Sequence, residues 1–201
     1  MKRSIDVVVA IGGLVVLLPV LGIVAFSVLI SSGHPVLFQQ LRVGKGGGLF
    51  SLVKFRTMSI LRGSERGAFD AGSTRRVTRV GGVLRKTKLD ELPQLWNVLR
   101  GEMSLVGPRP EVQRWVEVYP ERWARVLTMR PGITDPASIL YRNEEEILAS
   151  SSDPEKTYRE EILPRKLDCY EAYVREHTFW GDLRIILKTI KVGVWNRERK
   201  P

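Results

Sequence analysis

The stretch KLDELPQLWNVLRGEMSLVGPRP, residues 88–110, decides how this chain folds. It joins an acidic pair, Asp90 and Glu91, to apolar residues at helical spacing and ends with an arginine between two prolines. The spacing predicts a helix that begins near Thr87, a residue type that caps helix N-termini. Pro93 agrees with this start, because proline is tolerated in the first turn, where backbone N–H groups have no partner within the helix. We therefore expect both carboxylates in the opening turn.

The acidic pair has two interpretations. At the positive end of the helix dipole, Asp90 would stay ionised near neutral pH, as a nucleophile or a metal ligand must. Acidic residues in a first turn are also ordinary helix capping, which requires no chemistry. The rest of the chain has to decide between the two.

Composition excludes several classes of protein. With 201 residues, 43% of them apolar, the chain can form one domain with a hydrophobic core. A single cysteine, Cys169, excludes an internal disulfide framework and agrees with a reducing compartment. Two separated histidines, His34 and His177, are too few soft ligands for a zinc site. A bound metal is therefore expected to be a hard ion held by carboxylates, which favours Mg²⁺.

The net charge of +10 is concentrated in the middle of the chain. Residues 34–132 carry 18 Lys and Arg against 8 Asp and Glu, whereas residues 133–201 carry 12 against 13. Such a basic block suits nucleic acid, anionic lipid headgroups or a phosphorylated substrate, and charge alone does not choose among them.

Residues 7–30 form a run of 24 residues without a charge, which as a helix is long enough to cross a hydrocarbon core of about 30 Å. A spanning anchor and a re-entrant helix, which bends and leaves the bilayer on the side it entered, are both open. Pro19 supplies a break point in the run. Lys2 and Arg3 before the run and the basic block after it would both lie in the cytoplasm, which only the re-entrant form satisfies. Asp6 has the helical spacing to pair with Lys2 or Arg3.

Residues 36–43 and 49–58 are expected to form a β-hairpin, joined by a flexible turn at residues 44–48. The glycines of this turn are not followed by Gly-Lys-Ser/Thr, so a phosphate-binding loop is not favoured. Lys54 and Arg56 share one face of the second strand. There they would either clamp a diphosphate or lie on a solvated edge strand.

Arg109 lies between Pro108 and Pro110, which restrict the backbone and present the guanidinium at low entropic cost. That suits bidentate binding of a phosphate, and a structural arginine in a proline turn is the alternative. Arg130 precedes a second tight turn, Pro131-Gly132-Ile133-Thr134. Residues 59–82 read as a surface loop that lies near the site or contacts the membrane interface. Its Arg75, Arg76 and Arg79 are expected near lipid headgroups.

The remainder of the chain reads as helical. Trp115 and Trp123, in an amphipathic segment over residues 111–129, suit either the core or an interfacial belt. The acidic run at residues 144–146 suits a solvated helix start. Helices are expected over residues 154–176 and 179–195, and the second is cationic and amphipathic. It would lie in a membrane interface or pack against the core.

Taken together, these motifs resemble the bacterial sugar transferase family, small monotopic phosphoglycosyl transferases, over nearly the whole chain. The motifs that carry the resemblance are Lys2, Arg3 and Asp6 before the apolar run with Pro19, Gln40-x-Arg42-x-Gly44, Lys54-Phe55-Arg56-Thr57-Met58, Leu89-Asp90-Glu91-Leu92-Pro93-Gln94, Met103-Ser104-Leu105-Val106-Gly107-Pro108-Arg109-Pro110 and Arg130-Pro131-Gly132-Ile133-Thr134.

With the patterns above, the resemblance predicts an α+β, mostly helical fold with a small β-hairpin and amphipathic interfacial helices. Residues 1–33 would form a re-entrant membrane helix-break-helix with Pro19 at the break. Residues 34–201 would form a catalytic domain lying on the membrane. The resemblance implies a monotopic protein at the cytoplasmic face of the bacterial inner membrane.

The resemblance implies transfer of a sugar-1-phosphate from a UDP-sugar to polyprenyl (undecaprenyl) phosphate, with release of UMP through a covalent aspartate intermediate. This would be the first membrane step of glycoconjugate assembly, such as lipopolysaccharide, capsule, exopolysaccharide or glycoprotein. Downstream glycosyltransferases would be further partners, and nucleic acid would not. The alternative is a membrane-tethered basic module that binds anionic lipid or nucleic acid without catalysis. An ordinary glycosyltransferase would release UDP instead.

By position, Asp90 resembles the nucleophile and Glu91 the Mg²⁺ ligand of the family. The substrate-binding candidates are Lys54, Arg56, Arg109, Arg130, Arg142 and Asp168. The chain departs from many relatives after the Pro-Gly-Ile-Thr motif, where it has Asp135-Pro136-Ala137-Ser138 in place of Gly-Trp-Ala-Gln. This departure leaves the contacts of Arg142 and the identity of the sugar open.

Overall fold

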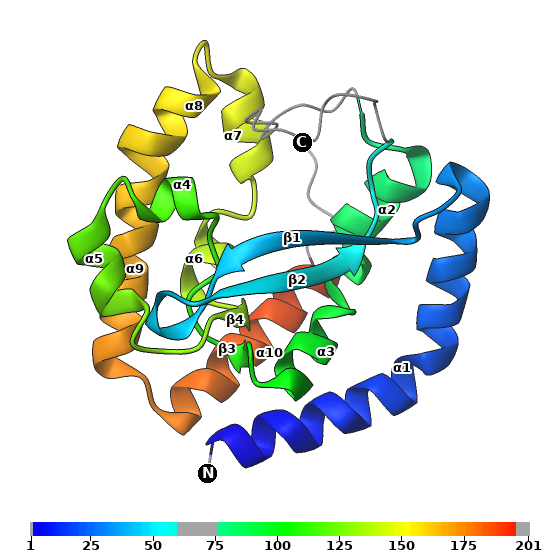
Figure 1. Ribbon diagram of the computed structural model, residues 1–201, viewed down its shortest axis with the longest axis horizontal. Helices are drawn as coiled ribbons and strands as arrows, with labels where there is room; N and C mark the ends of the chain where they lie inside the picture. Colours follow the sequence, from blue (N-terminus) through cyan, green and yellow to red (C-terminus); the bar gives the residue numbers. More distant parts are fainter. Residues whose placement is uncertain (1, 60–75, 196–201) are drawn as a thin grey trace.

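The computed structural model describes residues 2–59 and 76–195, with side chains to residue 191. These residues are mostly helical with two small two-stranded sheets, which confirms the α+β prediction. In Figure 1 the hairpin crosses the middle of the molecule, with α1 curving around one side and α4, α5, α8 and α9 on the other. In chain order the elements are α1 (Lys2–Ser32), β1 (Leu37–Val43), η1 (Lys45–Gly47), β2 (Leu49–Phe55), α2 (Arg79–Thr87), η2 (Leu89–Glu91), α3 (Gln94–Arg100), β3 (Ser104–Val106), α4 (Gln113–Val116), α5 (Pro120–Val126), β4 (Gly132–Thr134), α6 (Pro136–Leu140), α7 (Glu144–Ser150), α8 (Pro154–Thr157), η3 (Tyr158–Ile162), α9 (Leu163–Glu176) and α10 (Phe179–Trp195).

The first helix, α1, is 31 residues long and mostly exposed. Among the described residues it is the one helix with the length and apolar composition to cross a membrane. Helical structure continues through Pro19, so the expected break does not interrupt the helix. Figure 1 shows that α1 instead changes direction about midway, as expected where a proline removes one backbone hydrogen bond.

The N-terminal end of α1 is tied to the folded domain. Lys2 Nζ donates to the Val106 carbonyl (2.9 Å) and pairs with Asp182. Asp6, expected to pair with Lys2 or Arg3, instead accepts from Ser104 Oγ at 2.8 Å. A further link comes from Arg3, which donates to the carbonyls of Val98 (2.6 Å) and Leu99 (3.0 Å) at the end of α3.

The C-terminal end of α1 is tied to the same domain through Arg56. This buried guanidinium, which follows β2 directly, donates to the carbonyl oxygens of Gly33 (2.5 Å) and His34 (3.0 Å) and to that of Ser32. Both ends of the apolar helix are therefore attached to one domain.

The predicted hairpin is confirmed. β1 and β2 pair antiparallel, with Val43 opposite Leu49 next to the turn. The turn lies where it was predicted, and its flexibility stays a prediction. Lys45–Gly47 forms a 3₁₀ turn, and Gly46 N donates to the Leu127 carbonyl at 2.8 Å. Because Gly46 has φ 72, a conformation that glycine tolerates, glycine suits this position of the turn.

The second sheet brings two distant motifs together. β3 and β4 pair in parallel, with Ser104 beside Gly132 and Val106 beside Thr134. A Cβ on Gly132 would lie 2.1 Å from Gly107 N, so the backbones approach as closely as two glycines allow. This pairing sets the residues that precede Arg109 against the Pro-Gly-Ile-Thr turn.

The loop predicted over residues 59–82 lies largely on residues 60–75, outside the described residues, and so does Arg75. The end of that prediction is wrong, because α2 already begins at Arg79. Thr78 caps the helix by accepting from Gly81 N at 2.9 Å, and a Cβ on Gly81 would lie 2.0 Å from the Thr57 carbonyl oxygen. Tertiary packing thus fixes a helix whose sequence has few apolar residues.

The C-terminal half contains the largest core cluster. Trp115 and Trp123 are buried in it with Tyr158 and Tyr170, which confirms the core interpretation of both tryptophans. The amphipathic segment that carries them forms two short helices, α4 and α5. The helices predicted over residues 154–176 and 179–195 are confirmed, the first with a π-helical turn at Tyr158–Ile162.

Candidate active site

The acidic pair lies in the 3₁₀ turn η2, between α2 and α3, rather than in the first turn of an α-helix. Thr87 does not cap a helix start: it is the last residue of α2, and its Oγ1 donates to the Val83 carbonyl. Lys88 then reverses the chain with the left-handed values φ 59 and ψ 16. The spacing of apolar residues is similar in one continuous helix and in a 3₁₀ turn followed by an α-helix. It could therefore not distinguish the two structures.

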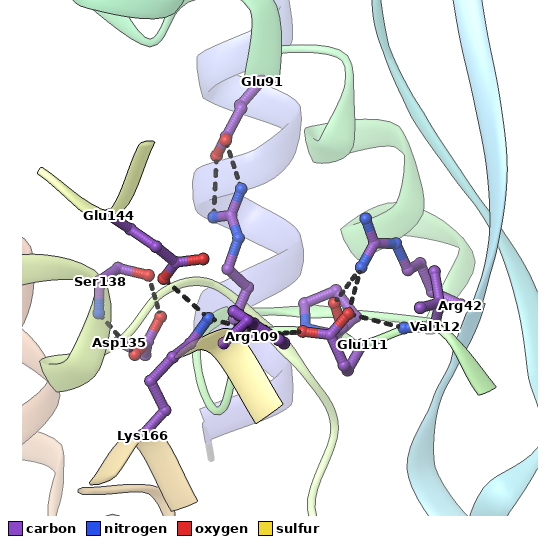
Figure 2. A network of polar contacts seen from close by, with 11 residues as sticks. Arg42, Glu91, Arg109, Glu111, Val112, Asp135, Ser138, Glu144 and Lys166 are labelled. Atoms are coloured by element: carbon purple, nitrogen blue, oxygen red, sulfur yellow. Dashed lines mark hydrogen bonds and ion pairs between the residues drawn. The ribbon is translucent and has the colours of Figure 1, made fainter. Parts of the chain in front are cut away.

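Glu91 pairs with Arg109 through both carboxylate oxygens, at 2.5 Å and 3.3 Å (Figure 2). Burial alone would raise the pKa of Glu91. The charge and hydrogen bonds of Arg109, aided by Lys88 and Lys54, outweigh it and lower the pKa to about 2. Conversely, the negative charge of Glu91 raises the pKa of Arg109 above its ordinary value. The pair is therefore fully charged at physiological pH.

Asp90 is only 5% exposed, and its Oδ1 has no hydrogen-bond partner in the described part of the chain. Burial raises the pKa of Asp90 to about 6, and the neighbouring Glu91 adds to the rise. Lys54, Lys88 and Arg109 oppose it. Desolvation dominates at this position, and an α-helix dipole is not the cause, because Asp90 lies in a 3₁₀ turn. The carboxylate is still largely ionised above pH 7.

Two predicted cations lie beside the carboxylates. Lys54 and Arg109 both act electrostatically on Asp90 and Glu91. Lys54 Nζ lies 5.5 Å from the centre of the Phe38 ring. Burial and the nearby Arg42 lower the pKa of Lys54 to about 8. A third cation, Lys88, was missed, although its position two residues before Asp90 was a usable signal.

The other predicted substrate-binding residues have different surroundings. Arg56 donates to the backbone carbonyls at the end of α1. Arg130 Nε donates to the Gly101 carbonyl at 2.8 Å. Asp168, 70% exposed, pairs with Arg122 at 2.7 Å. None of these side chains is among the main charges acting on Asp90 or Glu91, and their substrate roles stay predictions.

Arg142 borders a separate open hollow. This hollow, about 600 Å³ in volume, lies between α6 and α7, and Leu140, Asn143 and Glu146 also line it. The sequence Asp135-Pro136-Ala137-Ser138, where this chain departs from many relatives, has a structural explanation. Asp135 is fully buried and caps α6, accepting hydrogen bonds from the backbone N and the hydroxyl of Ser138.

A buried polar network beside Arg109 was not predicted. Glu111 accepts from Arg42 Nη1 (2.9 Å) and Tyr158 Oη (2.6 Å), and Lys166 Nζ lies between Tyr158 Oη and Glu144 (Figure 2). The only local signal was an acid directly after Pro-Arg-Pro. Its side-chain partners Arg42 and Tyr158 are 69 and 47 residues away along the sequence, beyond the reach of periodicity.

The carboxylates fit one mode of Mg²⁺ binding. The described residues contain no group of three or more His, Cys, Asp or Glu that could enclose a metal. However, Mg²⁺ is commonly held by one or two carboxylates, with water and substrate phosphates completing its shell. Glu91, the predicted ligand, offers one such carboxylate, next to the unpartnered Oδ1 of Asp90.

Comparison with known proteins identifies relatives along the whole chain. Residues 1–196 match the family described as "Bacterial sugar transferase". The chain is 35% identical to the UDP-glucose:undecaprenyl-phosphate glucose-1-phosphate transferase of Escherichia coli K12, over 98% of this chain and 41% of that protein. A protein of the same name from Caulobacter vibrioides is 36% identical, over 94% of this chain and 68% of its own length. The UDP-N-acetylgalactosamine-undecaprenyl-phosphate N-acetylgalactosaminephosphotransferase of Aeromonas hydrophila is 34% identical, over 94% of this chain and 43% of its own. The chain thus spans less than half the length of two of these relatives.

Proposed function

This chain belongs to the bacterial sugar transferase family, and we propose that it transfers a sugar-1-phosphate from a UDP-sugar to undecaprenyl phosphate, releasing UMP. The names of its relatives support the substrate classes. The observation that carries the proposal is the grouping of Asp90 and Glu91 with Lys54 and Arg109, which come from two other segments. The relatives are named for glucose, galactose and N-acetylgalactosamine, so the sugar remains to be measured.

In the first step, a carboxylate oxygen of Asp90 attacks the phosphorus that carries the sugar. An Asp90–phosphorus bond forms, the bond from that phosphorus to the bridging oxygen breaks, and UMP leaves with the electron pair. In the second step, an oxygen of undecaprenyl phosphate attacks the same phosphorus and releases the Asp90 carboxylate. The orphaned Oδ1 of Asp90 supports this role, because no hydrogen bond has to break before it reacts.

The surrounding charges suit a diphosphate. Negative charge develops on the leaving UMP, and Lys54 and Arg109 would stabilise it. A substrate phosphate competes with Glu91 for the guanidinium of Arg109, because a phosphate and a carboxylate each offer two oxygens that accept from one guanidinium. With Arg109 bound to the phosphate, the carboxylate of Glu91 would be free to hold Mg²⁺. The bound ion would neutralise part of the charge on the diphosphate.

The attachments of α1 support a re-entrant membrane helix. Lys2 holds its N-terminal end to Asp182, and Arg56 holds its C-terminal end by three carbonyl groups. A helix with both ends on one domain enters and leaves the bilayer on the same side, with Pro19 at the bend. We therefore propose that residues 1–33 form the membrane element and residues 34–201 a domain on the cytoplasmic face.

The last helix supports contact with the membrane surface. Trp180, Leu187 and Ile190 of α10 are 68%, 58% and 57% exposed. Apolar side chains exposed along one amphipathic helix suit an interfacial position.

The deciding experiment identifies the nucleotide that is released. The purified protein, in lipid nanodiscs with Mg²⁺ and undecaprenyl phosphate, is given UDP-glucose, UDP-galactose and UDP-N-acetylgalactosamine together with further UDP-sugars. We expect UMP with at least one donor. Release of UDP would indicate an ordinary glycosyltransferase, and absence of turnover across a broad panel would refute the proposal.

Asp90→Asn tests the covalent step. This variant should lose all turnover and still associate with membranes, and mass spectrometry of the wild type stopped before acceptor is added should find the sugar phosphate on Asp90. Asp153→Asn is the matched control, because it makes the same change in an exposed carboxylate with no predicted role in the site, and asparagine also caps a helix. Substantial turnover by Asp90→Asn would remove Asp90 from the role of nucleophile.

A further inference from the structure

Glu111 carries a buried carboxylate that the proposed reaction does not use. Its side chain is 12% exposed, and it accepts hydrogen bonds from Arg42 Nη1 (2.9 Å), Val112 N (2.9 Å) and Tyr158 Oη (2.6 Å). Burying a charge costs free energy even when it is paired, and an apolar side chain would avoid that cost. The charge therefore calls for an explanation beyond stability.

The backbone around Arg109 is held on both sides. On the N-terminal side, Gly132 N donates to the Pro108 carbonyl at 3.0 Å. On the C-terminal side, Arg42 Nη1 donates to the Pro110 carbonyl at 3.2 Å, and Val43 N donates to the Glu111 carbonyl at 2.9 Å. The N-terminal support comes from the sheet β3–β4, whereas the C-terminal support comes from Arg42 and its neighbour Val43.

The side chain of Glu111 fixes Arg42 in the position that this support requires. Arg42 Nη1 is shared between the Glu111 carboxylate and the Pro110 carbonyl. Behind Glu111, Tyr158 lies in a π-helical turn, a feature that is rare and often found at functional sites. The buried Lys166 contacts Tyr158 Oη at 3.4 Å and Glu144 at 3.0 Å, which holds the hydroxyl towards Glu111. Figure 2 shows Glu111, Lys166 and Glu144 beside the Arg109–Glu91 pair.

We propose that Glu111 is a positioning residue for Arg109. Through Arg42 it holds the backbone at Pro110, and so sets the place from which the Arg109 guanidinium reaches Glu91 and the substrate diphosphate. Pro108 and Pro110 leave the segment few other conformations, so a small displacement at residue 110 is passed on to the guanidinium. The kinetic part of this proposal rests on the proposed function, and the structural part does not.

A double-mutant cycle tests the kinetic part. Glu111→Gln keeps the shape of the side chain and removes its charge, and Arg109→Lys removes the forked group that Glu111 is proposed to position. We expect Glu111→Gln to lower kcat/KM for the UDP-sugar about tenfold in the wild-type background and less than twofold in the Arg109→Lys background. An equal loss in both backgrounds would overturn the proposal.

Glu171→Gln is the matched control for this cycle. Like Glu111, Glu171 has a carboxylate that accepts from arginine, in this case from both Arg122 and Arg125, and it is 22% exposed. Glu171→Gln should change the midpoint of thermal unfolding and leave kcat/KM within twofold of the wild type. If Glu171→Gln lowers kcat/KM as much as Glu111→Gln does, the effect of Glu111 is general and the proposal fails.

Backbone hydrogen exchange tests the structural part without any substrate. In Glu111→Gln we expect exchange to rise at least threefold at Val43 and Val112, with no change at Gly46, whose N–H donates to Leu127 instead. Unchanged exchange at Val43 and Val112 would overturn the positioning role. If the wild type turns over no UDP-sugar, the proposed function fails, and the exchange experiment alone then decides the role of Glu111.

Discussion

Gly81 and Gly82 are neighbours in α2, yet alanine is expected to have opposite effects at the two positions. A Cβ on Gly81 would lie 2.0 Å from the carbonyl oxygen of Thr57 and 2.7 Å from its carbonyl carbon. Among the described residues, a Cβ on Gly82 would meet only Val77 Cγ1, at 4.0 Å. The atoms that crowd Gly81 belong to the backbone, so no side-chain rotation relieves the clash and α2 must move away from Thr57.

The size of the effect follows from what that movement breaks. Two hydrogen bonds cross the contact, from Thr78 N to the Thr57 carbonyl (3.0 Å) and from Arg85 Nε to Thr57 Oγ1 (3.0 Å). Each contributes about 1 kcal/mol, and overpacking adds about 1–3 kcal/mol. Gly81→Ala should therefore destabilise the fold by about 3–5 kcal/mol, which lowers Tm by roughly 10 °C. Gly82→Ala should stabilise it by about 0.5–1 kcal/mol, because alanine loses less entropy in a helix.

The assay is thermal unfolding of both variants and the wild type in the same nanodiscs at one scan rate. Because α2 leads directly to Lys88 and Asp90, Gly81→Ala should also lose turnover, whereas Gly82→Ala should keep it. A Tm for Gly81→Ala equal to or above that of the wild type would refute the packing of α2 against Thr57. Equal destabilisation by the two variants would refute it as well.

Three further predictions concern charged residues. Arg109→Lys keeps the charge but loses the fork that holds both oxygens of Glu91 here and would hold two oxygens of the diphosphate in the reaction, so kcat/KM should fall about tenfold to a hundredfold; an unchanged value would show that the fork of Arg109 has no part in the reaction. Lys88→Gly removes a left-handed non-glycine residue and should raise stability by about 1 kcal/mol while lowering turnover, and a lower Tm would contradict this. Burial would raise the pKa of Glu111, but Arg42 and its hydrogen bonds lower it below 4.5. Its contribution to stability is therefore complete above about pH 4.5 and is lost as the pH falls further, so denaturant unfolding of Glu111→Gln should depend less steeply on pH in that range.

Elements with regular patterns could be predicted from the sequence. The helix α10 was predicted with its observed bounds, Phe179–Trp195, because apolar residues recur along it at helical spacing. The hairpin was predicted because two alternating runs flank a cluster of glycines. The helix α2 was not, because its nine residues include Gly81, Gly82 and three cations. What makes it a helix is a close contact with Thr57, which no local pattern records.

Part of the candidate site could be predicted in the same way. Asp90 and Glu91 were identified because they are adjacent acids, and Arg109 because a proline lies on each side of it. Both are local features of the sequence. The strand pattern that grouped Lys54 with Arg56 could not separate them, although one lies beside the carboxylates and the other binds carbonyls at the end of α1. That difference depends on where α1 ends in space, and it appears only once the chain has folded.

The arginines that bind backbone carbonyls also bear on the choice between function classes. The basic block of residues 34–132 suits an extended polyanion as well as a small phosphorylated substrate. In the structure, Arg42, Arg56 and Arg130 each donate to backbone carbonyl groups. Part of the basic block therefore connects segments of the chain to one another. The cations that act on the acidic pair are Lys54, Lys88 and Arg109. Three cations converging on two carboxylates form a compact site, which fits a diphosphate better than it fits a nucleic-acid strand or a lipid surface. A binding surface for a polyanion has no use for two carboxylates among its cations, because they would repel the phosphates. A carboxylate that attacks phosphorus, in contrast, has to lie among the cations that bind the phosphate.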